Sequence, residues 1–546
     1  MTGTLTSARA SAPSETSPLL GDRNAGDGAV NGDSENGRVV GGNGPAEPAA
    51  AKKMHLIIPA VGIGVYMVAI DQLLTVATYA KIGNELNALN NTSWIATAYF
   101  LTLTSFQPLY GKLSDIFGRK PCLLFAYSVF AIGCLGCGLA QSMVQLCAAR
   151  AVAGIGGGGM NAVVSILLSD LVPLRERGVY QGYINLLWAA GTSSGAPLGG
   201  LLADSVGWRW SFIGQVPLCF VAFIAVYFVL DLPPVSHDHW LNKLRQIDFL
   251  GAFTLVIAVV ALLAGLDSGS NLGWSHIITI VSLSLTPALF GLFLFVEMRV
   301  ASNPFAPGHI IFDRTLFACY LVNFFGVAGQ MAILFFMPLF FQAVQGLSAT
   351  QSGALLVPGM IFGVIASLFG GWVIKRTGKF YWVTVSAYAL LLAAILPLGL
   401  SVWFRSTPGE VVGLIATSLG AGCGITTTLV GLLANTAVED TAVVIACSYL
   451  FRSLGSSIGI STGSAVLQQV LRTQLAARLP SGDEAREIEE NVRQSLDYIK
   501  ELPPHLAGQV RSSYQVATLG ALAMILIYLV VSFLVSFWIK EKTLKR

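Results

Sequence analysis

Three charged residues lie inside long apolar stretches of the sequence, at Asp71, Arg150 and Arg452. Asp71 interrupts the run VYMVAIDQLLTVATYA, which otherwise has the composition of a membrane-spanning helix. A charge near the middle of such a helix costs roughly 2.5–3.5 kcal/mol on insertion scales, so residues of this kind usually carry a function. At ~1.5 Å per residue, Asp71 and Arg150 lie about 10–14 Å below the same membrane surface. We therefore expect the two side chains to meet in one cavity.

This pair has two interpretations, and the sequence leaves both open. In the first, Asp71 and Arg150 form a static ion pair that locks two helices together. In the second, the Asp71 carboxylate changes its protonation or its partner as a central cavity opens to each side of the membrane. If protons are carried, a carboxylate must carry them, because the six histidines lie near span ends or in loops. Asp71 is the first candidate for that role and Asp170 the second.

Arg452 lies near the middle of its apolar stretch, and we expect it to face the central cavity. The alternative is a structural role, in which its guanidinium contacts a backbone carbonyl or a polar neighbour. We expect no metal site and no cofactor. His237 and His239 in the segment SHDHW are interpreted as solvent-facing loop residues, because two histidines and one aspartate in a loop rarely form a metal site.

Glycines cluster in two of the apolar stretches. GIGGGG (Gly154–Gly159) matches the GxGxxG dinucleotide pattern, but that fingerprint requires a preceding strand and a soluble helix. Inside an apolar helix, glycines instead allow close contact with a neighbouring helix. The same interpretation applies to GTSSGAPLGG, where a proline also bends the helix. Its residues of interest are Gly191, Gly195, Pro197, Gly199 and Gly200.

The elements that position these residues are predicted to be transmembrane helices. Of the 546 residues, 54% are hydrophobic and 11% are charged, too few charges to cover a soluble protein of this length. Runs of about 20 apolar residues, enough to cross the hydrocarbon core, recur along the chain. We predict an all-α polytopic membrane protein with fourteen spans, near residues 55–80, 93–112, 121–141, 143–169, 180–203, 211–231, 248–267, 275–297, 316–342, 352–374, 380–402, 410–433, 442–468 and 514–538.

Lys and Arg are concentrated on one side of these predicted spans, the side that also holds both chain ends. By the positive-inside rule this side is the cytosol. The short loops of the other side hold only Lys81, Arg209 and Arg405. We therefore predict that both termini are cytosolic.

An internal repeat joins the two halves of the chain. GKLSDIFGRK (Gly111–Lys120) and GWVIKRTGKF (Gly371–Phe380) each place two glycines seven residues apart, with basic residues around the second. Two related halves are typical of secondary transporters, whose substrate site lies between the halves near mid-membrane. The predicted organisation is a disordered tail (1–50), a six-helix bundle (51–235), two inserted helices (236–300) and a second six-helix bundle (301–546).

One non-cytosolic loop, about residues 470–513, is long enough to hold its own structure. The spacing of its apolar residues predicts a short amphipathic helix lying on the non-cytosolic face. Ser481 and Glu484 have the spacing of a capping box at its start. The apolar stripe consists of Ile488, Val492, Leu496 and Ile499. We expect this helix to serve packing rather than ligand binding.

Together, these motifs resemble those of the major facilitator superfamily, from about residue 52 to the C-terminus. RAVAGIGGGG is similar to the fourth-helix motif whose buried arginine, here Arg150, is associated with proton transfer. GTSSGAPLGG resembles the fifth-helix antiporter signature. With fourteen spans, the resemblance implies the drug:proton antiporter type. GKLSDIFGRK resembles the gating signature of the cytosolic side, which implies that role for Gly111, Asp115, Gly118, Arg119 and Lys120.

A closer resemblance is to the fungal vacuolar basic amino acid transporters. It rests on the segments SWIATAYFLT, SDLVPLRERGVYQGY, GAPLGG and GWRWSFIGQVP. This resemblance implies import of lysine, arginine or histidine into the vacuole against protons. The first span departs from the family pattern, because the usual D-x-T-I-V is here DQLLTV, which keeps Asp71 but lacks the following threonine.

The N-terminal tail carries a short pattern that agrees with this location. ETSPLL fits the acidic dileucine pattern [DE]xxxL[LI], with Glu15, Leu19 and Leu20 in the defining positions. It resembles sorting signals to the vacuole or lysosome and implies a sorting adaptor as a partner. The other expected partners are a small cationic substrate, protons and the lipid bilayer, with no nucleic acid.

The sequence thus predicts a proton-coupled antiporter of the vacuolar membrane for basic amino acids, and not an enzyme. The nearest alternative is a multidrug or polyamine antiporter of the same fold. A membrane receptor is a different class, and the duplicated gating loop argues against it because a receptor has no need of alternating access.

We predict that the tail directs location only. Leu19→Ala combined with Leu20→Ala should send the protein to the plasma membrane with transport intact, because the adaptor-binding side chains are lost and no span is touched. Fluorescence microscopy of a tagged protein measures this, and continued vacuolar location of the double variant would contradict the sorting role.

Overall fold

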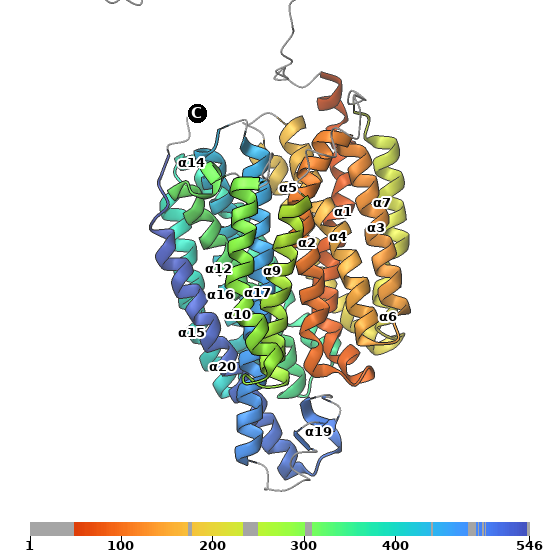
Figure 1. Cartoon of the computed structure of the whole chain (residues 1–546), viewed down its shortest axis with the longest axis vertical. Helices are drawn as coiled ribbons and strands as arrows, with labels where there is room; N and C mark the ends of the chain where they lie inside the picture. Colours follow the sequence, from red (N-terminus) through yellow and green to blue (C-terminus); the bar gives the residue numbers. More distant parts are fainter. Residues whose placement is uncertain are drawn as a thin grey trace, which may run out of the picture. The chain divides into compact units, whose positions relative to one another are not determined.

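The computed structural model describes residues 48–172, 177–232, 249–300, 308–437, 440–478, 488–489, 491–493, 496 and 498–542. All regular elements in these ranges are helices (Figure 1). Residues 46–546 form one compact unit, and the description below concerns this unit. The dileucine residues Glu15, Leu19 and Leu20, the metal-site candidates His237 and His239, and the capping-box residues Ser481 and Glu484 lie outside the described part.

The helices divide into two bundles and an inserted pair. The first bundle comprises α1 (Pro48–Glu85), α2 (Ser93–Phe117), α3 (Arg119–Leu139), α4 (Met143–Leu171), α5 (Arg177–Ser205), α6 (Arg209–Ile213) and α7 (Gln215–Val229). The inserted pair is α9 (Phe249–Asn271) and α10 (Ile277–Phe295). The second bundle comprises α12 (Arg314–Ala343), α13 (Ala349–Ala354), α14 (Val357–Thr377), α15 (Tyr381–Phe404), α16 (Thr407–Asn435), α17 (Thr441–Arg478) and α20 (Pro504–Ser536).

Helices are present at each of the fourteen predicted spans. Within the described ranges, eleven helices are long and apolar enough to cross a membrane; α2, α5 and α9 are not among them. In α2 and α5 the apolar composition is diluted by Ser, Thr and Gly, the residue types that allow close contacts with neighbouring helices. The all-helical fold is therefore as predicted, and the number of spans remains a prediction.

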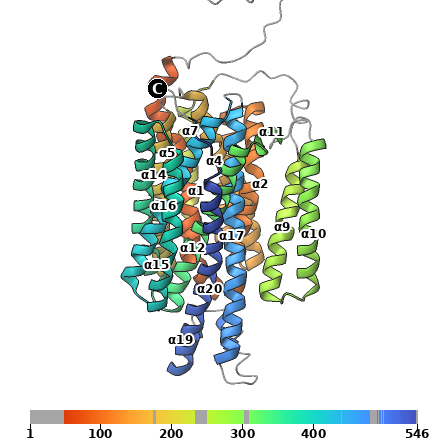
Figure 2. The same cartoon turned by 90° about the vertical axis from the view of Figure 1, so that its left-hand side faces the viewer.

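The two bundles meet along two seams. Within the first bundle α1 packs against α5 and α7, and α4 packs against α2 and α3; within the second, α12 packs against α17 and α20, and α16 against α14 and α15. Between the bundles, α2 packs against α17, and α5 packs against α13 and α14. The inserted pair stands to one side of the bundles, where α9 contacts both α2 and α17 (Figure 2).

In both copies of the internal repeat, the second glycine has a positive φ. Gly118 ends α2 with a φ of 95°, and Gly378 ends α14 with a φ of 68°. A positive φ strains any residue with a side chain, so the second glycine of each copy permits the tight turn into the next helix. The basic residues around these turns therefore lie at the same end of the two bundles.

The predicted loop 470–513 is shorter than expected, because the helices on both sides continue into it. α17 runs to Arg478, and α20 begins at Pro504; together with α19 (Tyr498–Glu501), their ends project beyond the other helices (Figure 1). The predicted apolar stripe is buried, with Ile488, Val492, Leu496 and Ile499 all less than 9% exposed. The Val492 carbonyl accepts a hydrogen bond from the Tyr514 hydroxyl at 2.9 Å. This segment thus packs against α20.

The glycines of α5 bring its backbone against that of α1. A Cβ atom added to Gly191 would lie 2.6 Å from the Tyr66 carbonyl oxygen, and one on Gly195 would lie 2.7 Å from that of Ile70. No larger residue fits at such distances without moving a backbone. An added Cβ on Gly199 would lie 2.8 Å from the Leu74 carbonyl oxygen, so these contacts hold α1 in place on both sides of Asp71.

We predict that Gly195→Ala destabilises the protein by roughly 1–3 kcal/mol, because the added methyl group overpacks the contact between α1 and α5. The matched control is Gly399→Ala in α15, where an added Cβ meets no atom within 4 Å. Thermal unfolding of the purified variants in detergent measures the difference, and equal melting temperatures would contradict the close contact.

Candidate functional site

The structure brings Asp71 of α1 and Arg150 of α4 together. Nη1 of Arg150 donates to Oδ2 of Asp71 at 2.6 Å, and the two side chains are 1% and 0% exposed. A charge-assisted hydrogen bond of this length is among the stronger kinds in proteins. Removing one partner of a buried ion pair costs about 3–5 kcal/mol, because the remaining charge is left without compensation.

Neighbouring groups satisfy the rest of this ion pair. Nε2 of Gln215, the first residue of α7, donates to Oδ1 of Asp71 at 3.1 Å. Nε of Arg150 donates to the Ile95 carbonyl of α2 at 3.3 Å, and its guanidinium lies 4.3 Å from the centre of the Tyr99 ring. The pair therefore joins α1, α2, α4 and α7, so a change in its protonation would be felt by four helices of one bundle.

A cavity of about 210 Å³ lies between the two bundles. Its wall is formed by α1, α2, α4 and α5 of the first bundle and by α12, α14, α16 and α17 of the second. The lining residues include four side-chain amides, several hydroxyls, the aromatic rings of Trp188 and Tyr449, and Arg452. The four amides belong to Gln72, Gln107, Asn161 and Gln330. Arg452 thus lines the central cavity.

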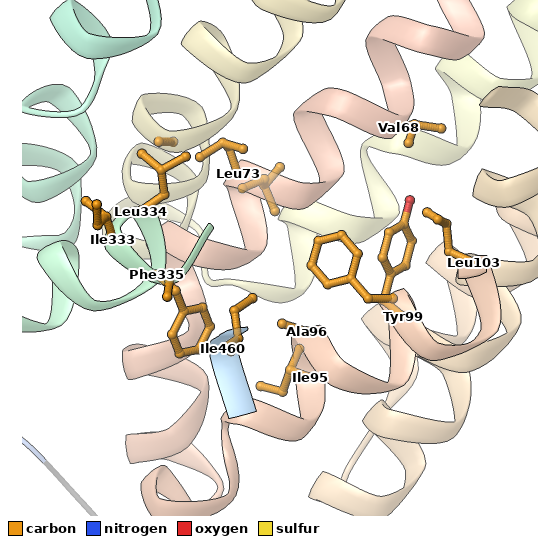
Figure 3. Packing of buried hydrophobic residues seen from close by; sticks show 14 of the residues in the cluster. Val68, Leu73, Ile95, Ala96, Tyr99, Leu103, Ile333, Leu334, Phe335 and Ile460 are labelled. Carbon is orange, nitrogen blue, oxygen red and sulfur yellow. The ribbon is translucent and has the colours of Figure 1, made fainter. Parts of the chain in front are cut away.

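Asp71 and Arg150 meet, but they do not line this cavity. Arg150 instead borders a second space of about 20 Å³, and both spaces share Gln72 and Phe100 in their walls. Figure 3 shows the apolar side chains that pack at this level, among them Leu73 of α1, Leu334 of α12 and Ile460 of α17. A thin layer of side chains therefore separates the ion pair from the central cavity.

Contacts between the bundles close the end of the molecule where α1 ends. The Tyr79 ring stacks on Phe335 with centroids 4.5 Å apart, and its hydroxyl donates to the Phe335 carbonyl at 3.2 Å. At the rim, the Asp204 carboxylate of α5 accepts hydrogen bonds from the Lys81 ammonium at 3.0 Å and from the Thr350 hydroxyl of α13 at 2.6 Å. The first bundle is thus tied to the second at this end.

The residues of the predicted gating motif lie at the opposite end. Arg119 donates to the Asp170 carboxylate at 2.9 Å and to the Ser114 hydroxyl at 2.5 Å, and the Lys120 ammonium lies 5.1 Å from the centre of the Tyr227 ring. The side chain of Asp115 lies outside the described part. Asp170 is therefore a partner of Arg119, and it is distant in the fold from the ion pair of Asp71.

Sequence reasoning missed two sets of residues at this site. Gln215 carries no charge, but it is an amide inside an otherwise apolar stretch, and that is a usable signal for a buried polar contact. Asp204 and Thr350 lie near span ends, where polar residues are common and give no indication of which partner they will meet. Their pairing depends on how the two bundles dock.

Residues 61–460 match the Major Facilitator Superfamily. The chain belongs to this superfamily. It is therefore a multi-pass membrane transporter and not an enzyme.

Three relatives from yeasts cover most of this major facilitator protein. The vacuolar membrane amino acid uptake transporter fnx2 of Schizosaccharomyces pombe is 40% identical and covers 85% of this chain and 80% of its own. The multidrug resistance protein fnx1 of the same organism is 35% identical, with 89% and 92% covered. Vacuolar basic amino acid transporter 2 of Saccharomyces cerevisiae is 31% identical, with 78% and 93% covered.

A solved structure agrees with the superfamily assignment at the level of the fold. A bacterial homologue of the human lysosomal transporter Spinster, in an inward-facing and unoccupied conformation, superposes with a TM-score of 0.59. It covers 90% of this major facilitator protein and 98% of the bacterial chain, at 13% identity.

We predict that Gln215→Leu destabilises the transporter by about 1–3 kcal/mol, because Oδ1 of Asp71 loses its donor while staying buried. Gln141→Leu is the matched control, since Gln141 is exposed just before α4 and its side chain has no hydrogen-bond partner among the described residues. The melting temperatures of the two variants in detergent measure the effect. A Gln215→Leu variant that is as stable as the control would show that this hydrogen bond makes no net contribution to the stability of the protein.

Proposed function

We propose that the protein is a proton-coupled antiporter that moves basic amino acids, namely lysine, arginine and histidine, from the cytosol into the vacuole. Relatives named for vacuolar amino acid uptake and for vacuolar basic amino acid transport support the substrate class and the membrane. The proton coupling rests on one observation: an aspartate and an arginine are paired in the interior of one bundle, beside the cavity that lies between the bundles.

In this proposal Asp71 is the proton carrier. When it is charged, its carboxylate holds Arg150 and Gln215 and so ties α1 to α4 and α7. A proton on Oδ2 removes the negative charge that holds Nη1 of Arg150, and the tie between α1 and α4 weakens. Because Gln72 follows Asp71 and lines the cavity, movement of α1 reaches the substrate directly. Proton uptake from the acidic lumen would thus favour release of the substrate on that side.

Asp71 acts through α1 in this scheme, since it does not line the cavity. Direct exchange of a proton for a cation at its carboxylate would require an opening of the layer formed by Gln72 and Phe100. Exchange of one cationic amino acid for one proton moves no net charge, so the pH gradient alone would drive it. Each pH unit is worth ~1.36 kcal/mol, which corresponds to about tenfold accumulation.

A multidrug or polyamine antiporter of the same fold is the alternative function. The multidrug relative in fission yeast, with 35% identity over most of the chain, is the observation in its favour. Both functions use the same fold and the same ion pair, so the substrate must be decided by transport measurements.

The proposal predicts ATP-dependent uptake of labelled lysine, arginine and histidine by vacuolar vesicles that contain this protein, well above that of vesicles without it. Collapse of the pH gradient with a protonophore should abolish the difference. Uptake that persists without the gradient would contradict proton coupling, and drug efflux without amino acid uptake would favour the alternative.

For the ion pair, we predict that Asp71→Asn abolishes gradient-driven uptake but retains counterflow, the exchange of labelled for unlabelled substrate without a gradient. Asp71→Glu should keep part of the driven uptake. Asp231→Asn, at an exposed carboxylate beyond α7, is the matched control with wild-type behaviour expected.

The Asn variant leaves Arg150 buried without its carboxylate and therefore loses stability. Counterflow is the necessary second measurement, because it shows whether the variant protein is still folded and able to transport. Wild-type driven uptake by a correctly located Asp71→Asn protein would exclude Asp71 as the proton carrier.

A further inference from the structure

The central cavity contains one charged side chain among its described lining residues, and that residue is Arg452. The remaining lining residues are apolar or carry neutral amides and hydroxyls. Within the described part of the chain, no carboxylate forms an ion pair with Arg452; its guanidinium lies 5.2 Å from the centre of the Tyr449 ring on the same helix. The cavity is therefore electropositive when it is empty.

A guanidinium in a cavity between membrane helices attracts anions, because the surroundings screen its charge less than bulk water does. Arginine also presents a planar set of donors that matches a carboxylate in a two-point contact. Lysine, arginine and histidine all carry such a carboxylate on their α-carbon. Polyamines and most cationic drugs do not, and they would bring further positive charge next to Arg452.

The residues next to Arg452 on α17 make hydrogen bonds to helices of the first bundle. On α17, the neighbouring Tyr449 hydroxyl lies 3.1 Å from the Ser165 hydroxyl of α4. The adjacent Ser453 donates to Gln107 of α2 at 3.3 Å. Arg452 therefore lies at the seam between the bundles, where a bound group can affect how they meet.

The same cavity offers an acceptor for the positive groups of the substrate. Oε1 of Gln330 on α12 is buried and has no hydrogen-bond partner among the described residues, whereas its Nε2 lies 3.4 Å from the Ser418 hydroxyl. A buried acceptor without a partner loses its hydrogen bonds to water without replacement, so an ammonium donor would be favourable there.

We propose that Arg452 binds the α-carboxylate of the substrate, and that a free carboxylate is required for binding. This inference rests on the proposed transport of amino acids and sharpens it. The proton carrier and the substrate anchor would then be separate residues, with Asp71 inside one bundle and Arg452 at the seam. Neutral amides, rather than an acidic side chain, would receive the cationic groups.

The test compares each amino acid with the amine that lacks only its carboxylate: lysine with cadaverine, arginine with agmatine, and histidine with histamine. Binding to the purified full-length protein is measured by the ligand-induced rise in melting temperature, and transport by counterflow in proteoliposomes. We expect each amine to bind at least tenfold more weakly than its amino acid. An amine that binds and competes as well as its amino acid would overturn the inference.

Substitutions of Arg452 provide the second part of the test. Arg452→Gln should weaken amino acid binding about 10- to 100-fold, the range expected for loss of a charged hydrogen bond. Arg452→Lys should retain part of it, because the charge remains while the two-point contact is lost. Arg405→Gln is the control: its side chain reaches Gln515 and Ser512 outside the cavity, and wild-type binding is expected.

The outcomes separate this inference from the proposed function. Wild-type affinity in a folded Arg452→Gln protein would overturn the inference and leave basic amino acid transport standing. If basic amino acids fail but a neutral one such as glutamine binds in a manner that depends on Arg452, the anchor is supported and the proposed substrate class is wrong.

Discussion

The buried pair of Asp71 and Arg150 is the constraint on which the first bundle depends. Two charges in the interior of a membrane protein are tolerable only when they neutralise each other and their remaining polar atoms find partners. Gln215 of α7, together with the Ile95 carbonyl and the Tyr99 ring of α2, provides those partners. Satisfying one carboxylate and one guanidinium thus fixes the mutual placement of four helices, while the glycines of α5 hold α1 from the other side.

The two bundles differ in whether their central charged side chains are paired. The first contains a compensated pair that is shielded from the cavity, whereas the second presents Arg452 to the cavity with no carboxylate beside it among the described lining residues. A proton on Asp71 would leave Arg150 as an uncompensated positive charge inside the first bundle. Arg452, by contrast, is already positioned to pair with a negative group in the cavity. Gln72 and Phe100 lie between the ion pair and the cavity. They border both the small space beside Arg150 and the central cavity that Arg452 lines.

Much of this arrangement could be predicted from the sequence, for identifiable reasons. Asp71 and Arg150 stand out because charge is rare in apolar helices, and their matched depth leaves few other partners. The glycine pattern of α5 predicts close packing because four-residue spacing places those residues on one face. The Gln215 contact was missed because an uncharged amide does not indicate its partner. The Asp204 and Thr350 contact depends on docking of two bundles whose sequences are 146 residues apart at that point, and no local pattern encodes it.

The inserted pair has a consequence for the route by which molecules reach the protein. α9 packs against both α2 and α17, so it covers from outside the seam that these helices form (Figure 2). A compound dissolved in the lipid that diffuses sideways towards this seam meets α9 first. The opposite seam, between α5 and α14, has no such covering helix among the described elements. A compound entering sideways from the bilayer would therefore have to part α5 from α14, and a water-soluble solute would gain nothing from this route.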